Sequence, residues 1–349
     1  MIFKQKINEI RRRAMRLLTR NIRQNAKPHN FSTCSIKRIL ISRPNSRLGN
    51  MLMVTPLLQD ISRVFPNAKV DLFVRSRIAP IIFSNYSNID TIITLPGKPF
   101  KQLFKYIKVW TFLMKRRYDF TINIEPGSSS GRLSTKFSKA RYKLFCDMDE
   151  EQNARYSDSN HMAKRPVYGL REYLSYESLD VPPIPPLSIC LSEQEIATGK
   201  EILNSIVLDK NKKTIGIYTF ATGNKCYSPE WWSETYKKLC DDFGNDYNIV
   251  EVLPMENVSQ IGFAATSYYS RDIREIAAVI DNLSVFLTAD CGIMHLASAT
   301  STPVLGLFSA TNPAKYCPYN TGSVAIKVTD IPDTNKTVSI MKDMLQQKT

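Results

Sequence analysis

Hydrophobic residues alternate along the chain between short continuous runs and longer segments in which they recur every three or four residues. Runs of the first kind fit strands buried on both faces, and segments of the second kind fit amphipathic helices. In the first half of the chain, the predicted strands cover residues 37–42, 70–74, 91–95 and 118–124. The predicted helices between them cover residues 49–65 and 100–115. This alternation predicts a parallel sheet covered by helices.

A proline-rich stretch separates this half from a second one with the same alternation. The segment VPPIPPLS starts at residue 181 and has four prolines in five positions, which excludes a helix interior or a central strand. Beyond it, the predicted strands cover residues 214–220, 247–253, 285–288 and 304–308, and the predicted helices cover residues 229–242 and 271–283. The sequence therefore predicts a second α/β domain.

The resulting fold prediction is α/β, with two Rossmann-like, doubly wound, parallel-sheet domains. We predict a leader and linker at residues 1–35, a first domain at 36–180, a second at 181–330, and a C-terminal tail or helix at 331–349. Open sheets of this kind bind ligands beyond the carboxyl ends of their strands. Two such domains joined by a linker are expected to face a cleft.

Length and composition agree with two soluble domains and add a strong charge. The chain has 349 residues, 43% of them hydrophobic, and a net charge of +15. An excess of this size favours an anionic partner: nucleic acid, an acidic lipid surface or a phosphorylated substrate. Seven scattered cysteines without a CxxC pair argue against a disulfide framework and for a reducing compartment.

The basic charge is concentrated at the N-terminus. Residues 1–25 place apolar side chains mostly three and four apart, and eight Lys and Arg stand there against the single acid Glu9. No apolar core or cleavage site of a secretory signal follows. We therefore expect a helix that lies on an anionic membrane surface, with a solvated basic leader or a helix docked on its own domain as alternatives. Stacking aromatics are nearly absent, which disfavours a nucleic-acid arm.

Several common classes of site lack their motifs. The chain has no GxGxxG, Walker A, HExxH or GxSxG pattern and no uncharged apolar stretch long enough to span a bilayer. The triplet Asp147-Met148-Asp149 could bind a metal, but acidic residues continue after it, so we interpret it as a solvated loop.

The segment TADCGIMHLA, residues 288–297, is the most informative stretch of the chain. A strand ends at Asp290, turns through Gly292 and opens a helix that carries His295. A helix start offers unpaired N–H groups and a partial positive charge, so it suits a diphosphate. Asp290 would then accept hydrogen bonds from sugar or ribose hydroxyls. The alternative is structural: Asp290 caps the helix and His295 is a core histidine.

Two stretches resemble a known family. The run TADCGIMHLASATSTPVLGLFSATNPAKYCPY looks like the C-terminal signature of the glycosyltransferase family 9 heptosyltransferases. The run RLGNMLMVTPLLQDISRVFPNAKVDLFV, about 240 residues earlier, resembles the N-terminal signature of that family. The resemblance implies a GT-B fold. It also implies an inverting transferase without metal or cofactor, which uses a nucleoside-diphosphate sugar such as ADP-heptose and an anionic glycolipid acceptor.

The family resemblance and the segment patterns together give the expected site residues. Lys225, in the loop ATGNK, would neutralise charge on the departing diphosphate; the alternative is an ordinary loop lysine. The full donor-side set is Thr222, Gly223, Lys225, Glu256, Asp290, Cys291, Gly292, Met294 and His295. The acceptor-side set is Arg47, Gly49, Asn50, Arg75, Arg77 and Arg132, the last three also being open to interpretation as surface arginines.

Asn50 departs from the family pattern, which has aspartate after this glycine as the expected base. An amide takes up no proton at neutral pH, so Asn50 can orient an acceptor but cannot deprotonate it. Either Glu125, at the end of the strand TINIE, performs that role, or the reaction tolerates a weak base, or the protein binds nucleotide sugars and glycans without turnover. We expect an active enzyme that extends a lipopolysaccharide core or another surface glycan, in the cytoplasm or on the cytoplasmic face of the inner membrane. Nucleic-acid binding is the remaining rival.

Overall fold

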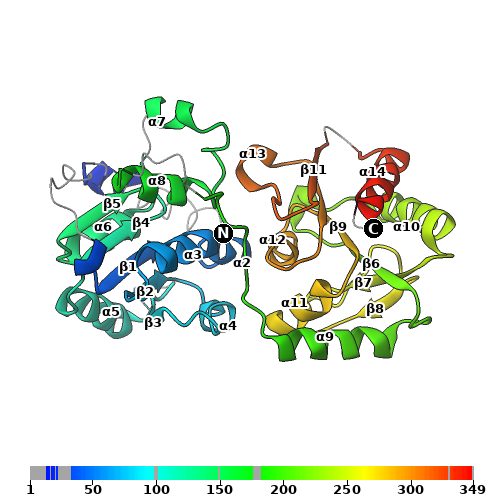
Figure 1. The fold of residues 1–349 in the computed structure, drawn as a ribbon, viewed down its shortest axis with the longest axis horizontal. Helices are drawn as coiled ribbons and strands as arrows, with labels where there is room; N and C mark the ends of the chain where they lie inside the picture. Colours follow the sequence, from blue (N-terminus) through cyan, green and yellow to red (C-terminus); the bar gives the residue numbers. More distant parts are fainter. Residues whose placement is uncertain are drawn as a thin grey trace. The chain divides into compact units, whose positions relative to one another are not determined.

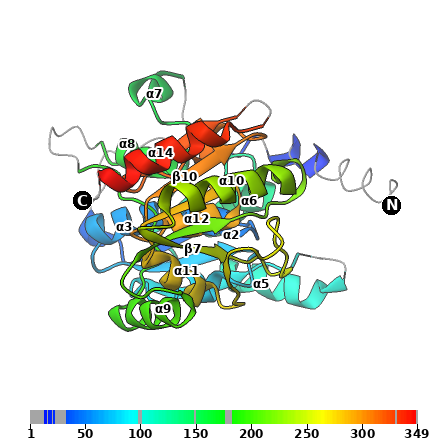
Figure 2. The same ribbon diagram turned by 90° about the vertical axis from the view of Figure 1, so that its right-hand side faces the viewer.

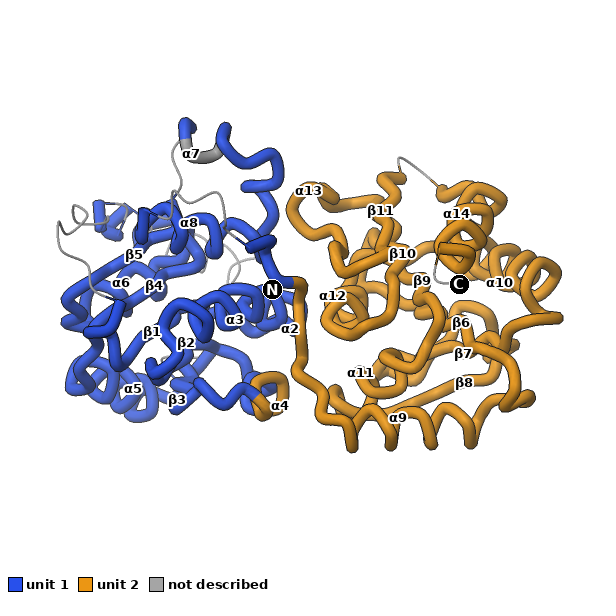
Figure 3. The backbone as a smooth tube through the Cα atoms, viewed as in Figure 1, with its two compact units in different colours: residues 1–80, 86–185 blue, residues 81–85, 186–349 orange. Residues whose placement is uncertain are grey.

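A computed structural model describes residues 13–15, 17–19, 21–22, 33–97, 101–147, 150–175, 182–328 and 331–347, without the side chains of residues 152 and 153. The chain forms two compact units (Figure 3). Unit 1 comprises Met1–Pro80 and Tyr86–Pro185, and unit 2 comprises Ile81–Asn85 and Pro186–Thr349. The predicted boundary at residues 180/181 lies outside the described residues, and the chain enters unit 2 at Pro186.

Unit 1 is built on a five-stranded parallel sheet. Its strands are β1 (Arg38–Arg43), β2 (Lys69–Val74), β3 (Ile89–Thr94), β4 (Phe120–Asn123) and β5 (Tyr142–Phe145). Their order across the sheet is β3-β2-β1-β4-β5. Ile41 of the central strand pairs with Leu72 on one side and with Ile122 on the other. Strands β1, β2 and β4 are buried almost throughout because helices cover both faces, as their continuous apolar runs predict.

The helices of unit 1 divide between the two faces of this sheet. They are η1 (Thr33–Ser35), α2 (Leu48–Leu52), α3 (Thr55–Val64), α4 (Ala79–Ile82), α5 (Leu103–Lys115), α6 (Ser129–Phe137), α7 (Glu150–Arg155) and α8 (Arg165–Tyr173). Helix α3 packs against α8, and α5 packs against α6 (Figure 1). The single helix predicted at residues 49–65 was wrong: it is two helices, because Pro56 in the first turn of α3 cannot continue a helix from α2.

Unit 2 repeats the plan with six parallel strands. They are β6 (Lys213–Tyr218), β7 (Tyr247–Val252), β8 (Thr266–Tyr268), β9 (Val285–Ala289), β10 (Val304–Phe308) and β11 (Val324–Lys327), in the order β11-β10-β9-β6-β7-β8. The sequence pattern did not predict β8 and β11. Both are short edge strands, and most of their residues are only half-buried, so they lack the continuous apolar runs of the central strands.

The helices of unit 2 include the C-terminal segment. They are α9 (Glu193–Ile206), η3 (Gly223–Lys225), α10 (Pro229–Phe243), α11 (Ile273–Asp281), α12 (Gly292–Ser298), α13 (Pro313–Tyr316) and α14 (Thr334–Gln346). Helix α14 lies beside α10 (Figure 2) and places Val338, Met341 and Met344 in the core of the unit. The segment at residues 331–349 is therefore part of the second unit rather than a separate tail, because its apolar side chains complete that core.

Both sheets have the classic Rossmann strand order, which confirms the predicted fold class. When the strands of each unit are numbered in chain order and read from one edge of the sheet to the other, unit 2 has the order 3-2-1-4-5-6 and unit 1 has the order 3-2-1-4-5. In each sheet the direction of winding reverses between the first and fourth strands, β1 and β4 or β6 and β9. The loops that leave the carboxyl ends of these two strands diverge, and ligands of such sheets bind there.

The N-terminal leader is described only at residues 13–15, 17–19 and 21–22, so the prediction of an interfacial helix over residues 1–25 lies mostly outside the described residues. Of its described residues, Leu17 and Leu18 are exposed and Thr19 is buried. Over the described parts of the chain, no helix is both long enough and apolar enough to cross a bilayer.

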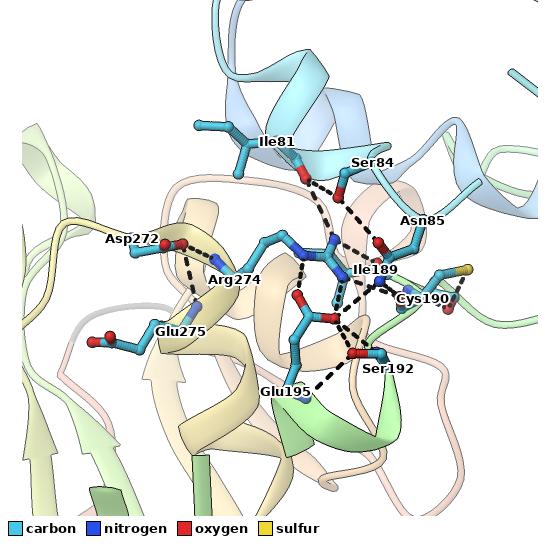
Figure 4. A network of polar contacts seen from close by, with 11 residues as sticks. Ile81, Ser84, Asn85, Ile189, Cys190, Ser192, Glu195, Asp272, Arg274 and Glu275 are labelled. Atoms are coloured by element: carbon cyan, nitrogen blue, oxygen red, sulfur yellow. Dashed lines mark hydrogen bonds and ion pairs between the residues drawn. The ribbon is translucent and has the colours of Figure 1, made fainter. Parts of the chain in front are cut away.

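Arg274 of α11 ties together several segments of unit 2 (Figure 4). Its guanidinium group donates to both carboxylate oxygens of Glu195 and to the carbonyl oxygens of Ile189, Cys190 and Ile81. Asn85 donates to Glu195 as well. The short segment Ile81–Asn85, although early in the chain, is thus held within unit 2 by hydrogen bonds from Arg274 to Ile81 and from Asn85 to Glu195 and Cys190.

We expect Arg274→Met to lower the free energy of unfolding by about 3 kcal/mol, because it leaves a carboxylate and several carbonyl groups without their buried partner. Arg274 holds the pKa of Glu195 at about 2, below its ordinary 4.5. The stabilisation from this pair is therefore complete above the ordinary pKa and is lost as the pH falls towards about 2. Urea unfolding across that pH range should show the difference between variant and parent narrowing in acid. Arg271→Met, at an exposed arginine just before α11, is the control and should unfold like the parent.

Candidate functional site

The expected donor-side residues converge where the winding of unit 2 reverses. Lys225 lies in the loop after β6, and Asp290 follows β9. The Lys225 ammonium nitrogen is 2.6 Å from a carboxylate oxygen of Asp290. Asp290 keeps only 5% of its side chain exposed, whereas Lys225 is half-buried. The structure therefore forms an ion pair from two residues that are 65 positions apart.

A third loop also reaches Asp290. Thr311, which follows β10, donates its hydroxyl to the same carboxylate oxygen that Lys225 contacts. The nearer ring nitrogen of His295, Nε2, is 3.9 Å from the other oxygen. Thr311 was missed in the sequence because a threonine in a polar loop carries no signal of its own. Asp290 thus organises loops from the carboxyl ends of three neighbouring strands.

The start of α12 does not fit the structural alternative in which Asp290 caps the helix. Cys291 occupies the N-cap position, so Asp290 does not cap this helix. Burial raises the pKa of the Cys291 thiol, although the nearby backbone N–H groups of Ile293 and Met294 act in the opposite direction. The Met294 side chain is buried and packs so closely on β10 that a Cβ at Gly306 would lie 2.9 Å from its sulfur. Any ligand contact of Met294 would therefore come from its backbone.

The remaining donor-side residues lie around the same strand ends. Thr222 and Gly223 are exposed at the start of the loop, where Gly223 has a φ of 66°, a conformation that favours glycine. Glu256 is exposed in the loop after β7. The pKa of Tyr218, at the end of β6, is raised chiefly by burial and also by the nearby Cys291 and Glu256.

Glu251 is a buried acid that the sequence analysis missed. One of its carboxylate oxygens accepts a hydrogen bond from Thr219, at 2.5 Å, and the other accepts one from Ser259, at 2.7 Å. Its pKa is raised, with burial as the largest cause. Thr219 also accepts from the backbone N–H of Gln260. Glu251 therefore fixes the loop that carries Glu256; a charged residue inside the apolar strand YNIVEV was the available signal.

In unit 1, a buried arginine contacts both Asn50, the residue expected to orient the acceptor, and Glu125, the candidate base. Arg43, at the end of β1, has 1% of its side chain exposed. It donates from Nη2 to the side-chain oxygen of Asn50, at 3.1 Å, and its Nη1 lies 3.3 Å from a carboxylate oxygen of Glu125. Asn50 belongs to α2, and Glu125 follows β4. Arg43 was not singled out in the sequence, where it ends an apolar run.

The other acceptor-side residues separate into two groups. Arg75 donates to the Ser130 hydroxyl at 3.2 Å, so the arginine after β2 and the serine-rich start of α6 do meet. Arg132 donates to the carbonyl oxygens of Pro126 and Ile22 and to Asp147, which makes it a structural link within unit 1. Of the three remaining acceptor-side residues, Arg47 and Arg77 are exposed, and Gly49 is buried in α2.

The acidic triplet near residue 147 is only partly described. Asp147 pairs with Arg132 at 2.8 Å, and Met148 and Asp149 lie outside the described residues. Among the residues that the structure does describe, no three His, Cys, Asp or Glu side chains are grouped as metal ligands.

Comparison with known proteins agrees with the motifs. The model of glycosyltransferase family 9 (heptosyltransferase) matches residues 270–344, a range that contains Asp290, His295 and Thr311. Lipopolysaccharide heptosyltransferase 3 of Escherichia coli is 22% identical over 309 residues, which cover 79% of this chain and 85% of that protein.

Solved structures share the fold. The family 9 glycosyltransferase of Veillonella parvula superposes with a TM-score of 0.73 at 16% identity and covers 93% of this chain and 100% of its own. The E. coli heptosyltransferase WaaC, solved with ADP, gives a TM-score of 0.63 at 17% identity and covers 88% and 99%. Both are consistent with a GT-B fold made of two parallel-sheet α/β units. The matched family region, the related sequences and the shared fold show that this chain is similar to the heptosyltransferases of glycosyltransferase family 9.

Proposed function

We propose that this enzyme transfers heptose or a similar sugar from a nucleoside-diphosphate donor, with ADP-heptose as the first candidate, to a lipopolysaccharide core or another surface glycan. The observation that carries the proposal is the Lys225–Asp290 pair at the reversal point of the unit 2 sheet. The heptosyltransferases named among the relatives, one of them solved with ADP, support the choice of donor.

On the donor side, Lys225 supplies the charge that the reaction needs. As the bond from the anomeric carbon to the diphosphate oxygen breaks, negative charge grows on the leaving diphosphate, and an ammonium group beside it lowers the barrier. Asp290 holds Lys225 in position through the 2.6 Å ion pair and accepts hydrogen bonds from hydroxyls of the donor. This arrangement supports transfer without a metal, because the positive charge of Lys225 balances the negative charge of the leaving diphosphate in place of a metal ion.

On the acceptor side, we assign the base to Glu125. The acceptor hydroxyl attacks the anomeric carbon from the face opposite the diphosphate, which inverts that centre, and its proton passes to the Glu125 carboxylate. Because Arg43 donates to the Asn50 side-chain oxygen, the amide group of Asn50 is turned so that its N–H groups face away from the arginine. Asn50 then serves as a hydrogen-bond donor that orients the acceptor.

A test of the proposal is turnover of labelled ADP-heptose with a truncated lipopolysaccharide core as acceptor. We expect labelled product of inverted configuration, loss of turnover in Asp290→Ala, and no loss when a metal chelator is present. The rival, a catalytically silent protein that binds nucleotide sugar, is motivated by Asn50 alone. It predicts donor binding without product from the parent protein, and that result would reject the transferase proposal.

A location at the cytoplasmic face of the inner membrane follows from the proposed donor and acceptor. The scattered cysteines suit a reducing compartment, and the net charge of +15 suits an anionic acceptor or membrane. Under this proposal nucleic acid is not a partner. Tight, strongly salt-dependent binding to any duplex by the intact protein would argue for that rival instead.

A further inference from the structure

Helix α5 has an apolar face that its own unit does not cover. The helix turns Leu113 fully into the core, with Tyr106, Val109 and Trp110 packed beside it. Trp110 contacts Phe137 at the end of α6 edge to face, with ring centroids 6.3 Å apart. These contacts fix the rotation of α5 about its axis, so the direction of every other side chain on it is determined as well.

Next to the core-facing side lies a stripe of exposed large hydrophobic residues. Leu103 is 51% exposed, Phe104 89%, Ile107 49% and Met114 39%. Ile107 lies four residues after Leu103 and three after Phe104, and Met114 lies seven residues after Ile107. This spacing puts the four side chains on one side of the helix. Single exposed hydrophobic residues are ordinary, but a contiguous stripe that includes an almost fully exposed phenylalanine indicates an interaction surface.

The third side of α5 is basic. Lys101 precedes the helix, and Lys105, Lys108 and Lys115 lie along it, all of them exposed. The neighbouring end of α6 adds exposed Lys136, Lys139 and Arg141 around Phe137. No acidic residue occurs in the sequence from 99 to 118 or from 126 to 146. The surface therefore combines an apolar stripe with a row of cations and no counter-charge from these segments.

We infer that this face of α5 docks on an anionic phospholipid bilayer, with Phe104 and Ile107 entering the interface and the lysines meeting the lipid headgroups. A helix that lies in a membrane interface needs an apolar stripe flanked by lysine and arginine, and α5 has both. A protein partner would have to be strongly acidic around an apolar groove, whereas an anionic bilayer offers both features everywhere on its surface.

The position of α5 in the fold links docking to the candidate acceptor side. The helix follows β3, so its first turn, with Leu103 and Phe104, starts from the carboxyl edge of the unit 1 sheet. Arg43 and Glu125 lie at the carboxyl ends of β1 and β4 in the same parallel sheet. A bilayer held by this end of α5 would bring lipid-linked glycans to that edge. Docking itself does not depend on the proposed transfer reaction.

The test is co-sedimentation of the full chain with two kinds of vesicle, one of phosphatidylethanolamine with phosphatidylglycerol and one of phosphatidylcholine alone. We expect binding to the anionic vesicles only. The double variant Phe104→Ser, Ile107→Ser should bind at least about tenfold more weakly. The double variant Lys105→Gln, Lys108→Gln should lose about fivefold for each lysine removed. Leu208→Ser, at a leucine of unit 2 that is 93% exposed, is the matched control and should bind like the parent.

Several outcomes would overturn the inference. The parent protein could fail to bind anionic vesicles, or the Phe104, Ile107 variant could bind as well as the parent while deletion of residues 1–25 removes binding. A variant that lost a self-association of the parent in solution, with vesicle binding unchanged, would assign the face to a second copy instead.

Turnover of a lipid-free acceptor should be unaffected in the Phe104, Ile107 variant. Absence of turnover even in the parent would reject the proposed function and leave the docking result standing.

Discussion

Replacing Lys225 with alanine is expected to lower kcat by about 10²–10³-fold, because removal of one preorganised group that stabilises developing negative charge has an effect of that size. The ammonium group lies 2.6 Å from Asp290 at the reversal point of the sheet, where a nucleoside diphosphate would bind. Steady-state kinetics with saturating donor measures the effect.

Ligand binding separates this role from a purely structural one. If Lys225 meets the leaving diphosphate, the alanine variant should lose much more affinity for a nucleoside diphosphate than for the matching nucleoside. Lys200→Ala, at an exposed lysine of α9, should leave both affinities unchanged. Equal losses for diphosphate and nucleoside would mean that the substitution disturbs the loop as a whole, and the assigned role of Lys225 would be wrong.

Replacing Glu125 with glutamine is expected to reduce kcat by about 10²–10⁴-fold, the usual contribution of a general base. The same change removes the carboxylate that lies 3.3 Å from buried Arg43, so some stability should be lost as well. Thermal unfolding and kcat must therefore be measured on the same preparations. Glu150→Gln, at an exposed glutamate of α7, is the control for the loss of one surface charge.

The arrangement around Arg43 offers a rescue that a structural role alone would not explain. In the Glu125→Gln background, Asn50→Asp puts a carboxylate on the other side of the same guanidinium group, where Asn50 already accepts from Nη2. We expect the double variant to recover part of the lost turnover, because the base is restored at a neighbouring position. Recovery of stability without any recovery of kcat would show that Glu125 only balances the charge of Arg43.

The segments ATGNK and TADCGIMHLA singled out Lys225, Asp290 and His295 in the sequence, and the structure brings these three residues together. Their role in binding the donor stays a prediction. Thr311 and Arg43 were not anticipated. Thr311 reaches Asp290 because the consecutive strands β9 and β10 are neighbours in the sheet. Arg43 reaches Glu125 because β1 and β4, which are distant in the sequence, are neighbours as well.

The hydrophobic pattern of the sequence did not predict one helix break and two edge strands. Residues 49–65 have helical periodicity throughout, but the periodicity does not register that Pro56 forces a new helix to start at Thr55. Strands β8 and β11 lie at the sheet edge with half-buried residues, so the continuous apolar signal of a central parallel strand is missing there.

The sequence by itself determined the α/β class, the two parallel sheets and the loops that carry polar chemistry, because periodicity and burial are properties of consecutive residues. Only the tertiary structure decided which loops meet. The order of strands in a sheet depends on contacts between residues tens of positions apart, and no local pattern contains it. That order joins Asp290 to Lys225 and Thr311, sets Arg43 between Asn50 and Glu125, and leaves one face of α5 uncovered by its own unit.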